Sequence, residues 1–373
     1  MRADFLVVGA GFFGATVAAK MAASGRKVKV IEKRSHIGGN CYSEIDPEAG
    51  IECHKFGSHI FHTSNEDVWA FLNQFTLFNE YRHTVWTTFK DHAYSMPINL
   101  STINAYYGFN LRPFEVEAFI EKERSKENIT NPVNLEEKAI SLVGRPLYEA
   151  FIKGYTIKQW EKDPRELPAD IITRLPVRHN FNNRYFDDKY EGIPLDGYSA
   201  VFKRMLDHPN IEVQLNADYF DLKEGLGDVP TLYTGPIDRF FDFKHGHLEW
   251  RTIDFEREVH QVQDYQGCAV MNYADAEVPY TRIHEFKHYH PERPTTGGTI
   301  IFKEYSRLAD RVDDPYYPVN TPKNSRLLEQ YQEDAKALKS IRFGGRLGSY
   351  RYFDMDDTVA AALDMADQLL GKE

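Results

Sequence analysis

The segment 9–14 reads Gly-Ala-Gly-Phe-Phe-Gly and stands between an apolar run, 5–8, and an Ala-rich stretch that ends near residue 24. The apolar run is typical of a buried strand and the Ala-rich stretch predicts a helix. A second apolar run, 28–31, ends in Glu32. This order predicts a dinucleotide site. The glycine turn lets backbone N–H groups at a helix N-terminus approach a pyrophosphate, and the acidic residue accepts hydrogen bonds from ribose hydroxyls.

A second glycine pair, Gly38 and Gly39, follows shortly after Glu32. Flavoproteins of the glutathione-reductase-like superfamily carry such a pair beside the cofactor, with a basic residue near the phosphates, so the pattern predicts FAD. A Gly-Gly turn that only leads the chain out of the second strand stays open as an alternative. The residues expected at FAD in this region are Gly9, Ala10, Gly11, Phe12, Phe13, Gly14, Glu32, Lys33, Arg34, Gly38, Gly39 and Asn40.

The composition of the 373 residues argues against nucleic acid as a partner. A net charge of −11 argues against nucleic acid, so an anionic substrate needs a local cluster of Arg and Lys. Aromatic residues make up 14% of the chain, which suits a site that stacks a base, although an aromatic-rich core explains most of them as well.

The cysteines indicate the compartment. Cys41, Cys53 and Cys268 are scattered and show no metal-ligand spacing, so we expect no metal site and a reduced, cytoplasmic protein. The N-terminus enters the first strand at once and no apolar run reaches membrane-spanning length. We therefore expect neither a signal peptide nor insertion into a membrane.

We expect a mixed α/β (α+β) fold in which a Rossmann-like FAD-binding βαβ domain is interrupted by a helical and an antiparallel-sheet subdomain. The expected FAD-binding parts are 1–65, 181–245 (approximate) and 321–373. The expected insertions are a mainly helical substrate-binding subdomain, 66–180, and an antiparallel β-sheet subdomain, 246–320. The stretch 164–183 holds three prolines and little periodicity, which predicts a long loop that acts as a lid.

Apolar periodicity and capping residues locate the elements more closely. Helices are predicted after an Asn65 cap and over 98–107, 113–124, 135–143, 146–160, 200–206 and 357–370. Strands are predicted over 211–215, 231–235, 249–258, 267–272, 281–286 and 298–305.

Seven segments, in order and almost end to end, resemble motifs of the UDP-galactopyranose mutase family, bacterial branch. They are 57–63 (GSHIFHT), 155–160 (YTIKQW), 172–176 (ITRLP), 280–285 (YTRIHE), 304–305 (EY), 316–318 (YYP) and 345–354 (GRLGSYRYFD). The match is loose at 87–94, where the family often has a glycine turn and a nearby Asn, and no site residue is assigned there.

The resemblance implies an isomerase (an intramolecular transferase, or mutase) that interconverts UDP-galactopyranose and UDP-galactofuranose without net redox change. In the family, N5 of reduced FAD forms a covalent adduct with the sugar C1 and expels UDP, and NADPH or a chemical reductant keeps FAD reduced. The product serves cell wall or surface polysaccharide biosynthesis. The resemblance also implies a cytoplasmic homo-oligomer, most often a dimer, whose partner is the UDP-sugar.

The resemblance assigns Arg174 and Arg282 to the diphosphate, whose charge grows as UDP leaves and is stabilised by fixed cations. Arg174 lies in the proline-bearing loop and is expected to arrive with the closing lid. Arg282 lies on a predicted strand and is expected to be fixed. Tyrosines that resemble the family's phosphate donors, or its tyrosine near the loop, are Tyr317, Tyr352 and Tyr185.

The residues that resemble the uridine site are Phe151, Tyr155, Thr156, Trp160 and Asn272, where aromatic faces stack uracil and polar groups read its edge. The three aromatic residues also fit one apolar stripe of a core helix, and this alternative stays open.

The resemblance also implies that His59, Arg346 and Asp354 lie near the isoalloxazine or the ribityl chain. The further residues expected at FAD are Ser58, Ile60, Thr234, Gly235, Tyr352 and Met355. His59 and His62 invite a metal interpretation, but no third ligand completes it, and His59 is expected against the flavin. Asp354 also fits the N-cap of the last helix. The expected catalytic set is Arg174, Arg282, His59, Tyr317, Tyr352 and Asp354, with no protein general acid assigned.

Two other classes stay open. An FAD-dependent amine or carotenoid-type oxidoreductase shares the nucleotide fold, but predicts an apolar tunnel and no paired arginines. A non-catalytic flavin or nucleotide-sugar binding protein does not require the anion, uracil and flavin motifs together.

Overall fold

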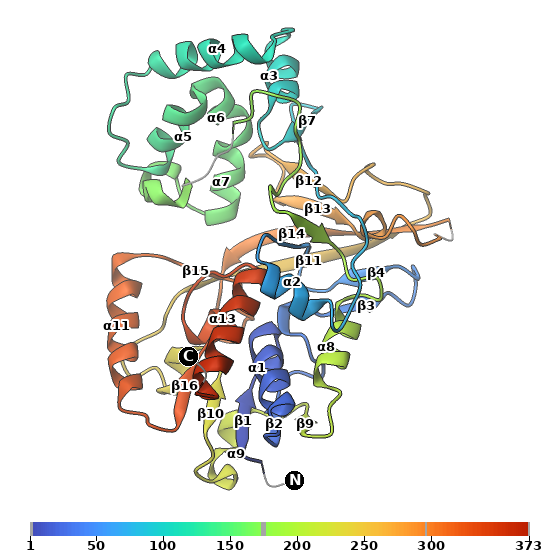
Figure 1. Cartoon of the computed structure of the whole chain (residues 1–373). Coiled ribbons are helices and arrows are strands. Elements are labelled where there is room, and N and C mark those ends of the chain that lie inside the picture. The colour runs from blue at the N-terminus through green and yellow to red at the C-terminus, as the bar shows by residue number, and fades with distance from the viewer. Residues whose placement is uncertain (1–2, 173–176, 295–296, 372–373) are drawn as a thin grey trace.

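A five-stranded parallel sheet forms the base of the molecule (Figure 1). The computed structural model describes residues 3–172, 177–294 and 297–371. The strand order is β16-β10-β1-β2-β9, and every neighbouring pair is parallel. The strands are β1 (Phe5–Val8), β2 (Val28–Ile31), β9 (Ile211–Gln214), β10 (Thr231–Tyr233) and β16 (Ile341–Phe343). Strands far apart in the chain thus complete one Rossmann-like sheet, as expected for the mixed α/β fold.

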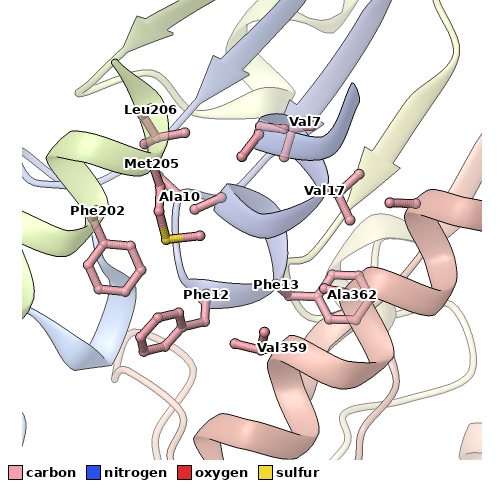
Figure 2. Packing of buried hydrophobic residues seen from close by; sticks show 14 of the residues in the cluster. Val7, Ala10, Phe12, Phe13, Val17, Phe202, Met205, Leu206, Val359 and Ala362 are labelled. Carbon is pink, nitrogen blue, oxygen red and sulfur yellow. The ribbon is translucent and has the colours of Figure 1, made fainter. Parts of the chain in front are cut away.

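Helix α1 (Phe12–Ala23) follows the first strand and is buried on nearly every side, which explains why it is so rich in Ala. It lies between α8 (Tyr198–Leu206) and α13 (Met355–Leu369), as Figure 2 shows. The rings of Phe12 and Phe202 lie 4.5 Å apart. This packing holds the helix N-terminus at one place. The remaining helices of this half are α9 (Tyr219–Leu226), α10 (Ile237–Phe240), α11 (Pro322–Lys336) and α12 (Gly345–Gly348).

A seven-stranded sheet lies between this half and the helices α3–α7 (Figure 1). Its order is β15-β11-β14-β13-β12-β6-β7, with all neighbours antiparallel except β12 and β6. The strands are β6 (Val85–Phe89), β7 (His92–Met96), β11 (Trp250–His260), β12 (Val270–Tyr273), β13 (Arg282–Glu285), β14 (Thr299–Leu308) and β15 (Tyr317–Pro318). The expected antiparallel sheet is present and is larger than predicted.

The expectation of a mainly helical segment 66–180 missed the hairpin β6–β7. Its turn residues, Lys90 and Asp91, have φ of 48° and 62°. Two left-handed residues make the tight hairpin turn that Asn and Gly usually supply, so the sequence carries no ordinary turn signal. The side chain of Asp275 accepts from the N–H of Lys90 at 3.1 Å, which ties the turn to the segment after β12.

The helices of that segment otherwise follow the prediction, and Asn65 caps α2 through its side chain. They are α2 (Glu66–Leu72), α3 (Leu100–Tyr107), α4 (Pro113–Ser125), α5 (Leu135–Val143), α6 (Arg145–Phe151) and α7 (Lys153–Trp160). The single helix predicted over 146–160 is wrong, because the chain bends at Ile152. The bend brings Gly154 against the backbone after β12, where a Cβ would lie 2.2 Å from the carbonyl oxygen of Ala274.

Four short strands form two separate antiparallel pairs. They are β3 (Ser43–Ile45), β4 (Glu52–His54), β5 (Phe61–Thr63) and β8 (Tyr190–Gly192), paired β3–β4 and β5–β8. In the described part of the chain, no helix is long and apolar enough to cross a membrane. The three cysteines are free. The domain division by residue number stays a proposal.

Gly14 gives the fold a sharp test. A Cβ at Gly14 would lie 2.0 Å from the carbonyl oxygen of Gly9. Gly14→Ala is therefore expected to lower the free energy of unfolding by about 1–3 kcal/mol, the usual cost of overpacking. Gly225→Ala in α9 is the matched control, since nothing lies within 4 Å of the new methyl. Urea denaturation measures both, and equal losses would contradict this account of the turn.

Candidate active site

The glycine turn after β1 leaves no room for a side chain at Gly9. Gly9 has a φ of +102°, and a Cβ there would lie 2.1 Å from Oγ1 of Thr234. That hydroxyl donates to the carbonyl of Val8 at 2.7 Å. At the N-terminus of α1, Gly11 offers no side-chain cap and the first turn holds no acidic residue. The first N–H groups of the helix are thus left for an anionic ligand.

The second glycine pair meets the first. The N–H of Gly38 donates to the carbonyl of Ala10 at 2.8 Å. A Cβ on Gly39 would lie 3.2 Å from Cα of Gly11. The two loops therefore face each other through backbone alone, and the residues present fit a dinucleotide diphosphate. An ordinary turn leaving β2 does not require this contact.

Glu32 organises the same corner. It is 6% exposed; one carboxylate oxygen accepts from the N–H of Ala10 and the other from the N–H of Arg34, both at 2.9 Å. A carboxylate has about four acceptor positions, so two stay available for ribose hydroxyls. The Arg34 guanidinium lies 2.9 Å from Asn40 Oδ1 and 2.8 Å from Asp314, and Lys33 lies 3.4 Å from the same carboxylate.

Arg346 ties the segment before α13 to the chain near β15. Its guanidinium donates to the carbonyls of Tyr316, at 3.2 Å, and Phe353, at 2.9 Å. It also lies 5.2 Å from the ring centre of Tyr352, whose hydroxyl donates to Asp354 at 2.9 Å. Asp354 occupies the N-cap position of α13, but its side chain makes no cap bond because Tyr352 engages it. Met355 begins the helix.

His59 has a defined protonation state and orientation. Its backbone N–H donates to Nδ1 of His54 at 3.1 Å, and its ring Nδ1 lies 2.7 Å from the carbonyl oxygen of Gly57. Burial lowers the pKa of His59 to about 4. The ring is therefore neutral at pH 7, Nδ1 carries the proton, and Nε2 is an acceptor.

Arg282 lies at the start of β13 with Glu304 and Tyr155 around it. Its Nε is 3.2 Å from Glu304, and a terminal nitrogen donates to the Tyr155 hydroxyl. Burial disfavours the charged form, but Glu304 and the hydroxyls of Tyr155, Tyr317 and Tyr185 act the other way and raise the pKa of Arg282. The guanidinium is therefore charged, fixed and only partly neutralised.

Asn272 lies directly across from Arg282 in the β12–β13 register. Its Oδ1 is buried and has no hydrogen-bond partner among the described residues. A buried acceptor without a partner costs free energy, so a ligand donor is the natural complement. The N3–H edge of a uracil is such a donor.

Comparisons with known proteins identify the family of this chain. The family model described as UDP-galactopyranose mutase matches residues 150–352, and an NAD(P)-binding Rossmann-like domain model matches residues 7–75. A probable UDP-galactopyranose mutase from Klebsiella pneumoniae is 44% identical over 98% of this chain and 94% of its own length. The chain belongs to the UDP-galactopyranose mutase family. It is thus an isomerase with a Rossmann-like nucleotide domain, and family and fold indicate a flavin cofactor.

Two further matches qualify this result. A dTDP-fucopyranose mutase from Escherichia coli is 43% identical over 97% of each chain, so one similar relative is named for a different nucleotide sugar. A crystal structure of a reduced UDP-galactopyranose mutase superposes with a TM-score of 0.73 at 14% identity, over 100% of this chain and 94% of that chain. That likeness confirms the fold.

The residues expected at uridine and flavin differ in how far they are buried. Phe151 is 7% exposed and packs in the helical core against Phe89, Tyr94 and Tyr106. It lies in α6, whereas Tyr155 and Trp160 lie in α7, so the three residues do not form one stripe of a single helix. Other predicted positions are a buried Thr156, a partly exposed Trp160 at the end of α7, a Tyr185 that is 48% exposed and a buried Ile60. Their contacts with substrate or flavin stay predictions.

The expected lid 164–183 contains two short 3₁₀ turns, η2 (Pro164–Glu166) and η3 (Ala169–Ile172). Arg174, assigned to the diphosphate, lies outside the described residues. His62 is bonded to Asp188 at 2.8 Å rather than to His59. The residues spaced for a metal ion in the described part of the chain are Asp264, Glu285 and His288, and the Lys287 ammonium lies 3.2 Å from Asp264.

Sequence reasoning missed three polar residues that support the site. His284 and Glu304 are buried beside Arg282, and Lys158 donates to the carbonyls of Tyr273, Asp275 and Tyr280 at 2.6–3.1 Å. Lys158 thereby fixes the end of β12 against α7. A signal was present for His284, since it shares strand parity with Arg282 and so lies on the same face of the sheet.

Proposed function

We propose that the enzyme interconverts UDP-galactopyranose and UDP-galactofuranose. The observation that carries the proposal is the cross-strand pair of Asn272 and Arg282, which sets an unpartnered amide oxygen beside a fixed, charged guanidinium under Tyr155. An amide acceptor suits the uracil edge, and a guanidinium suits the diphosphate. The named relatives support the same substrate class.

In this proposal, bound reduced FAD supplies its N5 as the nucleophile toward the sugar C1. The protein binds the diphosphate through Arg282 and Arg174 and donates from the Tyr317 hydroxyl. The Tyr352 hydroxyl donates to Asp354 in the free enzyme and turns to the phosphate when substrate binds. Burial raises the pKa of both hydroxyls, so they keep their protons and stay donors at pH 7. Neutral His59 offers an acceptor at Nε2. The two arginines and the tyrosine donors stabilise the negative charge that grows on UDP as it leaves.

A second substrate, dTDP-fucopyranose, is favoured by the 43% identical relative of that name. The two substrates differ in the base methyl, the ribose 2′-hydroxyl and the sugar 6-hydroxyl. The test incubates dithionite-reduced enzyme with UDP-galactofuranose in one reaction and with dTDP-fucofuranose in another. Chromatography follows the formation of UDP-galactopyranose and of dTDP-fucopyranose. We expect faster formation of UDP-galactopyranose; faster turnover of the dTDP-sugar would reverse the assignment.

Three further properties are proposals that rest on the family resemblance. They are a homodimeric state, a cytoplasmic location and reduction of FAD by NADPH. Light scattering of the purified protein tests the first, and anaerobic bleaching of the flavin by NADPH tests the last.

Purified protein is expected to be yellow, and Glu32→Ala is expected to weaken FAD binding about 10–100-fold, since a charged partner of ribose and of two backbone N–H groups is lost. The measurement is the FAD that stays bound to the protein after dialysis against increasing volumes of FAD-free buffer. Glu329→Ala, an exposed glutamate on α11, is the control and should retain FAD. Colourless protein that FAD cannot reconstitute would contradict the cofactor assignment.

A further inference from the structure

A chain of buried hydrogen bonds joins Ser58, in the loop expected at the flavin, to Glu304, which forms an ion pair with Arg282. The Tyr289 hydroxyl donates to Ser58 Oγ, and Ser58 is bonded to Nδ1 of His284. Nε2 of His284 lies 2.8 Å from one oxygen of Glu304. The other oxygen of Glu304 is 3.2 Å from Nε of Arg282.

Chemistry at the two ends fixes where each proton in this chain lies. Since a carboxylate only accepts, Nε2 of His284 carries the proton that it donates to Glu304. Burial lowers the pKa of His284, although Glu304 opposes the shift. The neutral ring then accepts at Nδ1 from the Ser58 hydroxyl, and Ser58 accepts from Tyr289. From Tyr289 through Ser58 and His284 to Glu304, each donor thus points to the next group.

Glu304 is thereby prevented from turning its carboxylate. It is 3% exposed; His284 is bonded to Oε2, and the Thr281 hydroxyl lies 3.1 Å from both Oε1 and the backbone carbonyl oxygen of Glu304. Burial raises the pKa of Glu304, but Arg282 and His284 outweigh it and lower the pKa to about 2, so Glu304 is an anion. Its contact with the guanidinium is confined to the Nε edge, while a terminal nitrogen reaches the Tyr155 hydroxyl.

A carboxylate that could rotate would take two parallel N–H groups of the guanidinium, which is the strongest pairing of Arg with a carboxylate. The terminal N–H groups are also the donors that bridge phosphate oxygens. A rotated Glu304 would therefore compete with a diphosphate for Arg282. An open guanidinium therefore requires that Glu304 be restrained. The buried His284 is bonded to the Glu304 oxygen that does not face Arg282.

We propose that His284 is a positioning residue that holds Glu304 on the Nε edge of Arg282, keeps the terminal N–H groups that Tyr155 does not engage open for a diphosphate, and through Ser58 couples this arrangement to the flavin-binding loop. The inference rests on the proposed function, since it takes Arg282 as the diphosphate contact and Ser58 as part of the flavin site. His284 acts through Glu304 and Ser58 and does not itself touch substrate.

The test measures UDP binding to the FAD-loaded enzyme by calorimetry, and the position of the flavin absorption band, in His284→Phe and Ser58→Ala. Each change is expected to raise the Kd for UDP about 5–30-fold, the effect of losing one or two hydrogen bonds to a charged group. Ser58→Ala is the sharper variant, because the lost hydroxyl is not one of the groups assigned to the diphosphate. The flavin band is expected to shift in both variants.

A double-mutant cycle separates coupling from general damage, because loss of stability alone lowers the melting temperature without making UDP affinities non-additive. The variant with both changes is expected to bind UDP no more weakly than the worse single variant. His260→Phe is the control: this histidine is also bonded to a glutamate of the same sheet, Glu258 at 2.9 Å, but belongs to no assigned site. It should bind UDP like the unchanged enzyme.

Wild-type UDP affinity and an unmoved flavin band in Ser58→Ala would overturn the inference, and so would strictly additive losses in the double variant. If His284→Phe does not fold, Ser58→Ala decides alone. Arg282→Ala separates this result from the proposed function. Unchanged UDP binding in Arg282→Ala disproves the diphosphate site and with it the inference. Weak binding there, with normal binding in Ser58→Ala, disproves the coupling only.

Discussion

Replacement of Arg282 by Ala is expected to reduce turnover by about 10²–10³-fold, the loss found when one preorganised charge stabiliser is removed. The guanidinium is charged and fixed by Glu304 and Tyr155 before any ligand binds. It therefore needs no reorganisation when charge develops on the diphosphate. Steady-state kinetics with UDP-galactofuranose measure the loss.

The fold and FAD content of Arg282→Ala are expected to stay close to those of the unchanged enzyme, because Glu304 keeps Thr281 and His284 as partners. Arg282→Lys should restore turnover only in part, since the charge returns without the planar fork. Arg307→Ala is the matched control: it lies on β14 of the same sheet and pairs with Asp254 and Asp313. Near-normal turnover of Arg282→Ala would refute its role, and loss of FAD would make Arg282 structural.

Arg174→Ala is expected to lose turnover to a similar extent and to weaken substrate binding as well. The family resemblance places this arginine in the expected lid, so it should contribute after closure, whereas Arg282 acts in a site already formed. A comparison of kcat and KM for the two variants tests this difference. Equal KM values for the two variants would remove the distinction.

The oxidised enzyme is expected to convert no measurable UDP-sugar, whereas the reduced enzyme turns over without consuming reductant. The proposed nucleophile is electron-rich only in reduced FAD, and the substrate and product have the same oxidation state. The experiment counts UDP-galactopyranose formed and NADPH oxidised in one anaerobic reaction. Many turnovers for each NADPH support the mutase.

One NADPH oxidised for each sugar converted would instead favour the oxidoreductase alternative. Equal rates in the oxidised and reduced states would remove any electronic role for the flavin. A useful control is Tyr305→Phe: Tyr305 donates to Glu256 at 2.7 Å on the exposed side of the sheet. This variant should keep both the redox requirement and the stoichiometry.

Local signals in the sequence account for the nucleotide half. The order of strand, glycine turn, helix and acidic strand end lies within 5–32, so neighbouring residues alone dictate it, and β1, α1 and β2 appear where predicted. The helix 135–143 was also placed correctly, since Asn134 caps it and Gly144 ends it. Long motifs supplied the family, which the comparisons confirm.

Only the tertiary structure decided how the substrate side is held. The hairpin β6–β7 turns on two left-handed non-glycine residues, and the bend between α6 and α7 follows from the contact of Gly154 with Ala274. Neither the turn nor the bend shows as a local pattern. The same holds for the contact of Gly39 with Gly11, which joins two loops through backbone alone.

The support of Arg282 is the clearest case. Its own strand shows in the sequence, but its orientation depends on Glu304 from a neighbouring strand, on Tyr155 from α7 and, through His284, on Ser58 from a loop far earlier in the chain. The family resemblance of the motif around Arg282, and not residue type alone, proposes this arginine for the diphosphate. Which of its nitrogens stay free is decided by hydrogen bonds between segments that only folding brings together, because a buried carboxylate binds wherever its partners hold it.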